Sequence, residues 1–245
     1  MARESSVSKE IYTRHIRLTR YLNDAWIFTE LLRPELDARA RGLRASRSRV
    51  KRPYPVPKGK LTIMSNRRDE DVGNLFAAQH QRGVFETNIV SMVSRTEAFI
   101  QEAIGIVAIA YPAKLGILAD KGGIPLDLFL EHESRDDVIR RFVALKCEGL
   151  MFGKPSEYLD KTEKTLSIEL DRETVEAFIE IKASRDIIIH NSGVINKLYV
   201  EKAGKKRRGE AGQELVIDNN YLRHVLVTLK KLSGSIQSKT ESVYK

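Results

Sequence analysis

Apolar residues recur at steps of three and four along most of the chain, a spacing typical of helices that pack through one face. The first helix is predicted over residues 8–32. It is expected to end near Arg33, because the proline at position 34 disfavours helical backbone in the residue before it. A longer helical region opens near Asp69, bends or breaks at Gly83 and ends at Pro112. The N-terminal half should therefore hold two long helices.

Later helices are marked by residues suited to helix ends. Ser134, with an aspartate three residues later, marks one helix start, and a short helix is expected from about Ser156. Asp171 and Asp218 are suited to cap two further helices at their N-termini. Gly193 is suited to follow the first of these, because glycine adopts the left-handed backbone common just past a helix end.

Only one short run, residues 214–217, resembles a strand. The predicted class is all-α, a helical bundle with at most this one strand-like segment. We expect an N-terminal helix over 1–37, a basic, proline-containing linker or arm over 38–68, and a helical domain over 69–245. The closely spaced prolines of the middle segment exclude a helix interior there.

Positive charge is concentrated in that middle segment. The chain has a net charge of +9 and a pI near 9.6, and residues 38–68 hold eleven Lys or Arg with no Asp or Glu, so the rest sums to −2. Such a block can release condensed counterions from a nucleic acid. A solvated connection without a binding role is the alternative. The candidate nucleic-acid contacts are Arg44, Arg47, Arg49, Lys51 and Arg52.

Composition supports a soluble, cytoplasmic protein with a real core. Apolar residues make up 42% of the chain and charged residues 31%. The single cysteine, Cys147, excludes an internal disulfide framework and suits a reducing compartment. The N-terminus has no apolar secretory segment. The most apolar run, residues 98–119, is interrupted by Gln101, Glu102 and Pro112, so a buried helix is expected and no membrane partner.

The stretch ASRDIIIHNSGV, residues 183–194, sets three isoleucines that should be buried between residues suited to phosphate chemistry. His190 can take a proton from an RNA 2′-hydroxyl or give one to the leaving oxygen. The Arg185 guanidinium can hold the charge that develops on the phosphorane oxygens. No metal or other cofactor is expected, because this chemistry requires none and the sequence shows no tight cluster of metal ligands.

The spacing of the two residues leaves alternatives open. Five positions of an ideal helix turn Arg185 and His190 roughly 140° apart. Either the helix loosens before Gly193, or the two groups meet across a seam with a second copy of the chain. The structural alternative is a histidine that only completes free carbonyls, or favours the dipole, at a helix C-terminus.

The segments EIKASRDIIIHNSGVINKLYVEKAG and GQELVIDNNYLRHVLVTLKKL resemble the HEPN superfamily, in particular its branch of RNase-like and accessory domains. The family signature is an arginine, a polar residue, several apolar residues and a histidine, which here begins with Arg185 and Asp186 and ends at His190. Asn191 opens a continuation that is similar to that branch's H-N-x-G-x-x-N, and Glu97 resembles the inward polar residue of its early helix. The resemblance covers about residues 80 to 235.

This resemblance implies a bundle that dimerises with its two motifs facing each other. It also implies metal-independent endoribonuclease activity, often in toxins or antiviral defence. Arg185 and His190 are then expected to be catalytic, Asp186, Asn191 and Glu97 to support them, and RNA and an antitoxin or regulatory protein to be partners. The alternative is a non-catalytic HEPN-like dimerisation or nucleic-acid-binding module that uses the basic segment.

Overall fold

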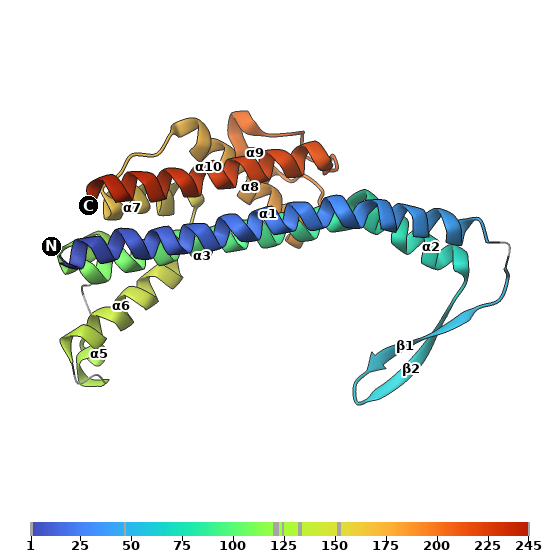
Figure 1. Ribbon diagram of the computed structural model, residues 1–245, viewed down its shortest axis with the longest axis horizontal. Coiled ribbons are helices and arrows are strands. Elements are labelled where there is room, and N and C mark those ends of the chain that lie inside the picture. Colours follow the sequence, from blue (N-terminus) through green and yellow to red (C-terminus); the bar gives the residue numbers. More distant parts are fainter. Residues whose placement is uncertain are drawn as a thin grey trace.

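The computed structural model describes residues 2–46, 48–119, 123, 125–131, 134–150 and 153–244, with the side chains of 2–6 and 131 excepted. Within these ranges the fold is helical apart from one β-hairpin, which confirms the predicted all-α class (Figure 1). The long helices are α1 (Ala2–Arg44), α3 (Val84–Ala110), α8 (Arg172–His190) and α10 (Asn219–Val243).

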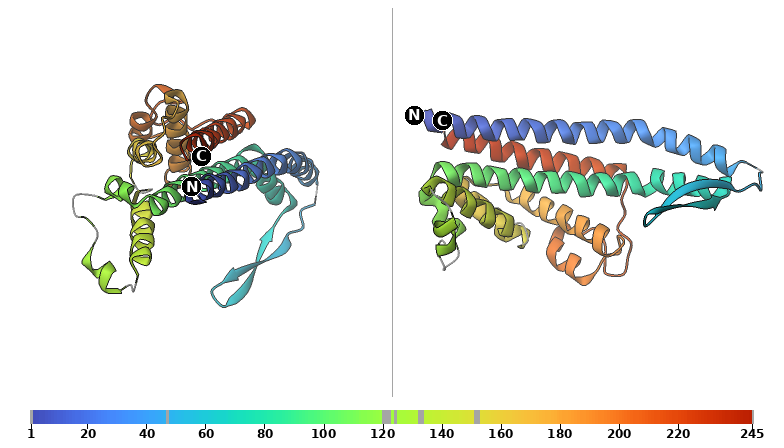
Figure 2. Two further views of the ribbon diagram at one scale, coloured as in Figure 1. Left: turned by 60° about the vertical axis from the view of Figure 1, so that its left-hand side comes forward. Right: turned by 90° about the horizontal axis from the view of Figure 1, so that it is seen from below.

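The long helices form a bundle in which α1 runs antiparallel to α2 (Asp69–Ala78) and α3 (Figures 1 and 2). Two contacts fix this direction. Arg44 Nε donates to Asn74 Oδ1 at 2.8 Å near one end, and Arg14 Nε lies 3.5 Å from Glu102 Oε2 near the other. Helix α10 packs against α1, α3 and α8. The core is built from completely buried side chains, including Leu22, Ile89, Ile104, Phe178 and Leu229.

Shorter helices complete the fold: η2 (Pro112–Lys114), α4 (Leu115–Leu118), α5 (Leu126–Glu131), α6 (Arg135–Leu150), α7 (Pro155–Leu166), α9 (Lys197–Ala203) and η3 (Gly204–Lys206). The starts predicted for the later helices at Ser134, Ser156, Asp171 and Asp218 are confirmed, whereas α1 begins at Ala2, ahead of the predicted residue 8. The Ser134 hydroxyl accepts from the Asp137 N–H at 3.1 Å ahead of α6, and α7 begins one residue before Ser156. The carboxylates of Asp171 and Asp218 each accept a backbone N–H of their helix, at 3.2 and 2.8 Å.

Helix α1 does not end near Arg33, so that prediction was wrong. It continues through Pro34 to Arg44. Tertiary contacts hold the backbone where the proline removes a hydrogen bond. The Arg33 carbonyl lies 3.0 Å from His80 Nδ1, Arg33 Nε donates to the His80 carbonyl at 3.3 Å, and the Arg33 guanidinium lies over the Phe85 ring. These contacts override the tendency of Pro34 to end the helix, and α1 therefore continues past it.

The long helical region is bent by a π-helix, not broken, at the expected glycine. The π-helical turn η1 (Gln79–Gly83) joins α2 to α3 without a loop. Such turns insert an extra residue into a helix and are frequent at functional sites. Here η1 lies directly across from Arg33 of α1.

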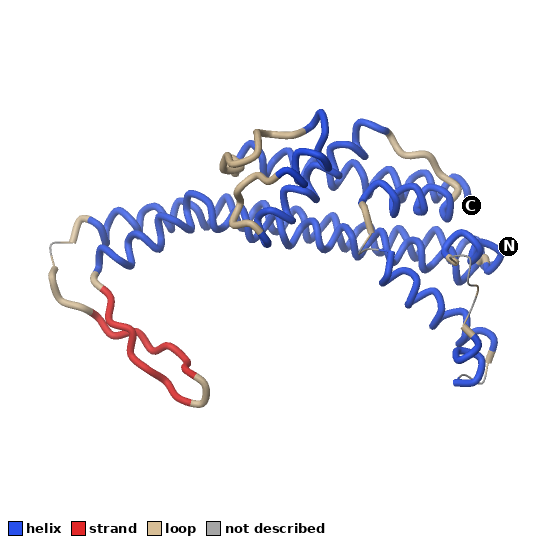
Figure 3. Tube along the Cα trace, turned by 180° about the vertical axis from the view of Figure 1, so that it is seen from behind, coloured by secondary structure: helices blue, strands red, loops and turns tan. Residues whose placement is uncertain are grey.

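The strands lie in a different place from the one predicted. Residues 214–217 contribute only an isolated bridge between Val194 and Glu214. The hairpin is formed by β1 (Arg52–Lys58) and β2 (Leu61–Arg67), inside the segment expected to be a linker or arm. It projects away from the bundle, joined to it at the ends of α1 and α2 (Figures 1 and 3).

The most apolar run of the sequence, residues 98–119, begins in α3, where Ile100, Ile104 and Val107 are inaccessible to solvent, and continues through η2 and α4. In the described part of the chain, no single helix has the length and apolar character to cross a membrane. One pair bent by 118°, Asp69–Ala110 with Pro112–Leu118, meets that test by length and composition alone.

Candidate functional site

Helix α8 carries the predicted motif and remains regular to its end. Asp171 caps its N-terminus, and it is α-helical through His190 without loosening. The three isoleucines are not all buried, contrary to expectation: Ile187 is inside, Ile188 is half-buried and Ile189 is 43% exposed. The motif therefore ends on the surface of the bundle.

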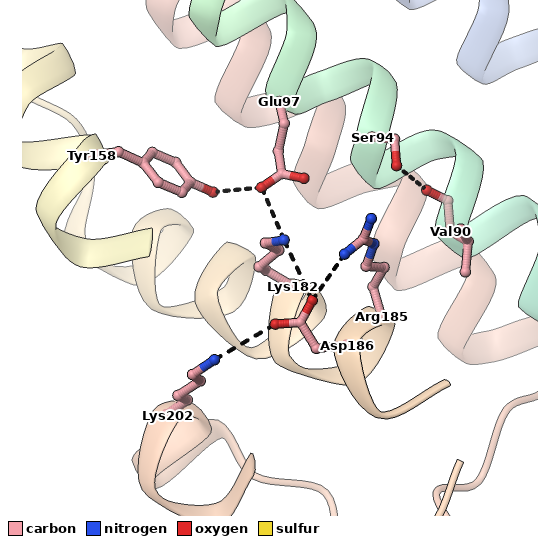
Figure 4. Close-up of polar contacts among 8 residues, drawn as sticks. All are labelled: Val90, Ser94, Glu97, Tyr158, Lys182, Arg185, Asp186 and Lys202. Carbon is pink, nitrogen blue, oxygen red and sulfur yellow. Dashed lines mark hydrogen bonds and ion pairs between the residues drawn. The ribbon is translucent and has the colours of Figure 1, made fainter. Parts of the chain in front are cut away.

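Asp186 is the centre of a cluster of cations on α8 and α9 (Figure 4). Its Oδ1 atom lies 3.1 Å from Arg185 Nη1 and 3.4 Å from Lys182 Nζ, and its Oδ2 atom lies 3.6 Å from Lys202 Nζ. Asp186 thus neutralises part of the charge that Arg185 would offer to a phosphate.

Glu97 extends this cluster toward α3 and α7. Its side chain is nearly buried, and its Oε1 atom lies 3.2 Å from Lys182 Nζ and accepts from the Tyr158 hydroxyl at 3.3 Å (Figure 4). Burial, with the nearby Glu97 charge, raises the pKa of Tyr158 well above its usual range, so the phenol stays a donor. The structure brings the predicted residues Glu97, Arg185 and Asp186 into one network, together with three residues that the sequence analysis did not single out: Tyr158, Lys182 and Lys202.

Arg185 and His190 do not share a face of α8. The Arg185 side chain is 23% exposed, and its guanidinium lies beside the α3 turn that carries Ser94 (Figure 4). Its Nε atom is buried and has no hydrogen-bond partner among the described residues. His190 is exposed, and no described residue donates to or accepts from its ring. Because the helix stays regular, a site that uses both groups requires a second copy of the chain.

Another arginine lies at the end of α8. Arg82, from the π-helical turn η1, packs on the turn after His190 so closely that a Cβ atom added at Gly193 would lie 1.8 Å from its Nη2 atom. Arg82 Nε lies 2.5 Å from Glu86 Oε1, while its Nη2 atom is buried and makes no hydrogen bond within the described part of the chain. Nothing in the local sequence pattern pointed to Arg82, because 108 positions separate it from His190.

The turn after α8 is fixed by its own backbone. Gly193 has a φ of 75°, as a glycine past a helix end allows, and its N–H donates to the Ile187 carbonyl at 2.9 Å. The predicted supporting residue Asn191 donates from its side-chain amide to the Val194 carbonyl at 2.5 Å. Asn191 therefore shapes the turn that follows His190.

A buried carboxylate network lies one helical turn from the motif. Glu180 is 2% exposed and accepts from the hydroxyls of Ser184 at 2.6 Å, Tyr199 at 2.8 Å and Tyr221 at 3.1 Å. Burial first, and then the Glu180 charge, raises the pKa of Tyr199 to about 12. The three donors tie α8, α9 and α10 together. The signal for this network in the sequence was Glu180, an acidic residue among the apolar residues of the inner face of α8.

The basic segment divides into residues held by the bundle and residues free of it. Arg44 bonds to Asn74, and Arg52 Nε lies 3.1 Å from Oδ1 of the buried Asp69. Arg49 and Lys51 are exposed and pair with no described acid. The predicted contact Arg47 lies outside the described residues.

Comparisons with known proteins add no family to this picture: a scan against family models and searches of curated proteins and of solved structures found no match. Within the described ranges, no group of three or more His, Cys, Asp and Glu side chains is placed to hold a metal ion.

Proposed function

We propose that the protein binds nucleic acid through the arm, defined as residues 48–68. The observation that carries this proposal is an exposed, acid-free β-hairpin. The arm holds seven Lys or Arg and no Asp or Glu. All of β1 is exposed, and so is β2 except for the half-buried Ser65. An isolated two-stranded hairpin is marginally stable in water, so a partner that covers it fits its construction.

The prolines of β1 argue against another protein strand as a partner on that edge of the hairpin. Pro53, Pro55 and Pro57 alternate along the strand, and β1 still pairs with β2 over its full length. The N–H groups of alternate residues face the pairing strand, and proline has none. The outer edge of β1 therefore lacks donors at three successive positions and cannot accept a further strand there.

The exposed Lys and Arg side chains of the arm allow the proposal to be tested through the salt dependence of binding. Each phosphate neutralised contributes a slope of roughly −0.7 to log K against log salt for a single strand. Neutralising Arg49, Lys51, Lys58 and Lys60 together should flatten the slope for a single-stranded RNA probe by about three units. Arg52 is left unchanged, because it anchors the hairpin to Asp69.

A control variant separates local contacts from net charge. Neutralising four exposed bundle residues, Arg140, Arg141, Lys164 and Lys197, removes the same charge away from the arm. This control should leave the slope within about half a unit of the wild type, because distant surface charges are screened beyond roughly 10 Å. Equal effects of the two variants would mean that the arm makes no specific phosphate contact.

A second candidate function is metal-independent RNA cleavage of HEPN type at the end of α8. Two observations favour it: the His190 ring is exposed, and the Arg82 Nη2 atom lies against the adjoining turn, and neither group has a hydrogen-bond partner in the described ranges. His190 would take the 2′-hydroxyl proton, the 2′-oxygen would attack phosphorus, and the P–O5′ bond would break as the 5′-oxygen takes a proton from water. Arg185 takes part in this reaction only if a second copy of the chain places its guanidinium opposite His190.

Cleavage is tested by mapping the RNA ends formed in EDTA. The proposal expects 2′,3′-cyclic phosphate ends and a loss of activity of at least about 100-fold in His190→Ala. Arg82→Ala and Arg185→Ala identify which arginine contributes. Products with 3′-hydroxyl ends and a strict magnesium requirement would exclude this mechanism but leave binding by the arm intact.

A further inference from the structure

The two faces of the β-hairpin differ in charge. Side chains directly opposite each other in an antiparallel pair point to the same face, and successive side chains along a strand alternate between the faces. The pairing of β1 with β2 is continuous. One face, here called the charged face, therefore carries Arg52, Tyr54, Val56 and Lys58 with their partners from β2. The other, the proline face, carries Pro53, Pro55 and Pro57 with their partners Asn66, Met64 and Thr62.

The charged face has cations at both ends and apolar side chains between them. Arg52 and Arg67 lie at the base, where the hairpin joins the bundle, and Lys58 lies at the tip (Figure 1). At about 3.3 Å per residue, the base and the tip are about 20 Å apart. Val56 and Ile63 lie opposite each other in the middle and are 39% and 44% exposed. An exposed apolar strip is therefore framed by positive charge.

The acidic residues that follow the hairpin in the chain lie past its base. Asp69, Glu70 and Asp71 form the first turn of α2, and Asp69 is already paired with Arg52. Arg67 and the two lysines of the tip are exposed and pair with no described acid. The charged face therefore keeps free cations at both of its ends.

We propose that the arm enters the major groove of double-stranded DNA with its charged face toward the base pairs, an inference that rests on the nucleic-acid binding proposed above. The major groove of B-form DNA is about 12 Å wide and admits a two-stranded β-ribbon. Cations about 20 Å apart along the ribbon reach the phosphates on both edges of the groove. Val56 and Ile63 then lie over the base edges, where the thymine methyl group is an apolar contact.

Other nucleic acids use the hairpin less completely. The minor groove of B-form DNA is only about 6 Å wide. The major groove of an RNA duplex is deep and narrow, and its shallow minor groove displays 2′-hydroxyls, which apolar side chains leave without partners. Single strands are held by stacking on aromatic rings, and Tyr54 is the only aromatic residue of the arm. Duplex DNA alone engages both the cations and the apolar strip.

The choice of duplex is tested with the full chain and two probes of about 20 base pairs, one of DNA and one of RNA with the same sequence. The two probes carry equal numbers of phosphates, so counterion release favours neither strongly. Fluorescence anisotropy at one salt concentration should show DNA bound at least about tenfold more tightly. Equal or tighter binding of the RNA duplex would overturn the groove assignment but leave phosphate binding by the arm intact. Absence of binding to any nucleic acid would overturn both proposals.

Variants of the two faces test the orientation of the hairpin. Val56→Ser/Ile63→Ser should weaken binding to the DNA duplex about tenfold and abolish its preference over RNA. The matched control is Thr62→Ser/Met64→Ser on the proline face, which should stay within about twofold of the wild type. Neither variant removes a charge, so both should keep the wild-type salt slope. Equal losses in the two variants would show that the charged face does not face the bases.

A change in the DNA alone tests the contact with the base edges. A duplex with uracil in place of every thymine keeps its charges and hydrogen-bonding groups and lacks the methyl groups in the major groove. The wild type should bind this duplex about fourfold more weakly for each methyl group that the apolar strip covers. Val56→Ser/Ile63→Ser should bind both duplexes alike. Equal binding of the two duplexes by the wild type would overturn the proposed position of the apolar strip.

Discussion

At the scale of single residues, the end of α8 is the most constrained part of the candidate site. Gly193 combines a positive φ with the close approach of Arg82, and the two effects can be separated by substitution. Gly212 offers a control, since its φ is 92° and an added Cβ would meet nothing within 4 Å.

Gly193→Ala is therefore expected to destabilise the protein by about 1–3 kcal/mol, from left-handed strain of about 1–2 and up to about 1 for moving the flexible end of the Arg82 side chain out of the overlap. Gly212→Ala should cost only the strain. Urea unfolding at neutral pH measures both. Adding Arg82→Ala to Gly193→Ala should recover the overlap part. Equal costs at the two glycines would show that Arg82 yields freely to the new methyl group.

The residues around Asp186 show how ion pairs formed in the folded chain change the charge that the motif presents. The motif alone presents a free guanidinium beside a histidine. In the folded chain, Asp186 is shared between Arg185, Lys182 and Lys202, and Glu97 takes Lys182 from the other side. The charge available to a phosphate is set by this balance, which includes residues from three helices.

At the scale of elements, α1 shows tertiary contacts overriding a local signal. Pro34 lacks an N–H, so the Glu30 carbonyl loses its usual partner within the helix. The helix persists because His80 contacts Arg33 twice: its Nδ1 atom lies against the Arg33 carbonyl, and its own carbonyl accepts from the Arg33 Nε atom.

Pro34→Ala should accordingly stabilise the protein by about 1–3 kcal/mol, since it restores one hydrogen bond and removes a clash, less a small gain in unfolded-chain entropy. The matched control is Ala38→Pro, one turn later at another exposed position, which should destabilise it by about 3 kcal/mol. Thermal unfolding followed by circular dichroism compares the two. A destabilising Pro34→Ala would mean that the proline shapes a bend on which the packing on η1 depends.

At the scale of the whole molecule, the arm lies outside the core of the bundle. The bundle buries its apolar residues in one continuous core, whereas the arm is exposed on both faces and held at its base by Asp69. Asp69 accepts from the Ser46 hydroxyl at 2.7 Å and pairs with Arg52, which is 60% exposed.

Replacing residues 50–67 with a Gly/Ser linker of about six residues should lower the unfolding free energy by only about 1–3 kcal/mol, because the buried Asp69 carboxylate loses Arg52 but keeps the Ser46 hydroxyl as a donor. Leu229→Ala in the core of α10 should cost about 2–5 kcal/mol by comparison. The excised protein should keep its helix content and lose most of its salt-dependent binding to RNA. A loss of the folded bundle on excision would show that the hairpin stabilises it.

The sequence by itself determined the class of the fold and most of its helix starts. Spacing of apolar residues is a local property, and so is a capping carboxylate, as Asp171 and Asp218 show. Concentrated positive charge is also plain in the sequence, and it marked the arm before its conformation was known. The motif around Arg185 was visible for the same reason, because its residues are neighbours along one helix.

Only the tertiary structure decided how these parts combine. The helix end that Pro34 predicted does not occur, because contacts with η1 hold the helix. The segment with alternating prolines in the arm forms a strand only because it pairs with β2. Arg82 reaches the end of α8 from another helix, and Lys182 joins Glu97 across the bundle. The exposure of Ile27, Phe28 and Leu31 on α1 follows from which face of that helix packs on the bundle. Contacts between distant segments decide each of these features, and a local pattern does not contain them.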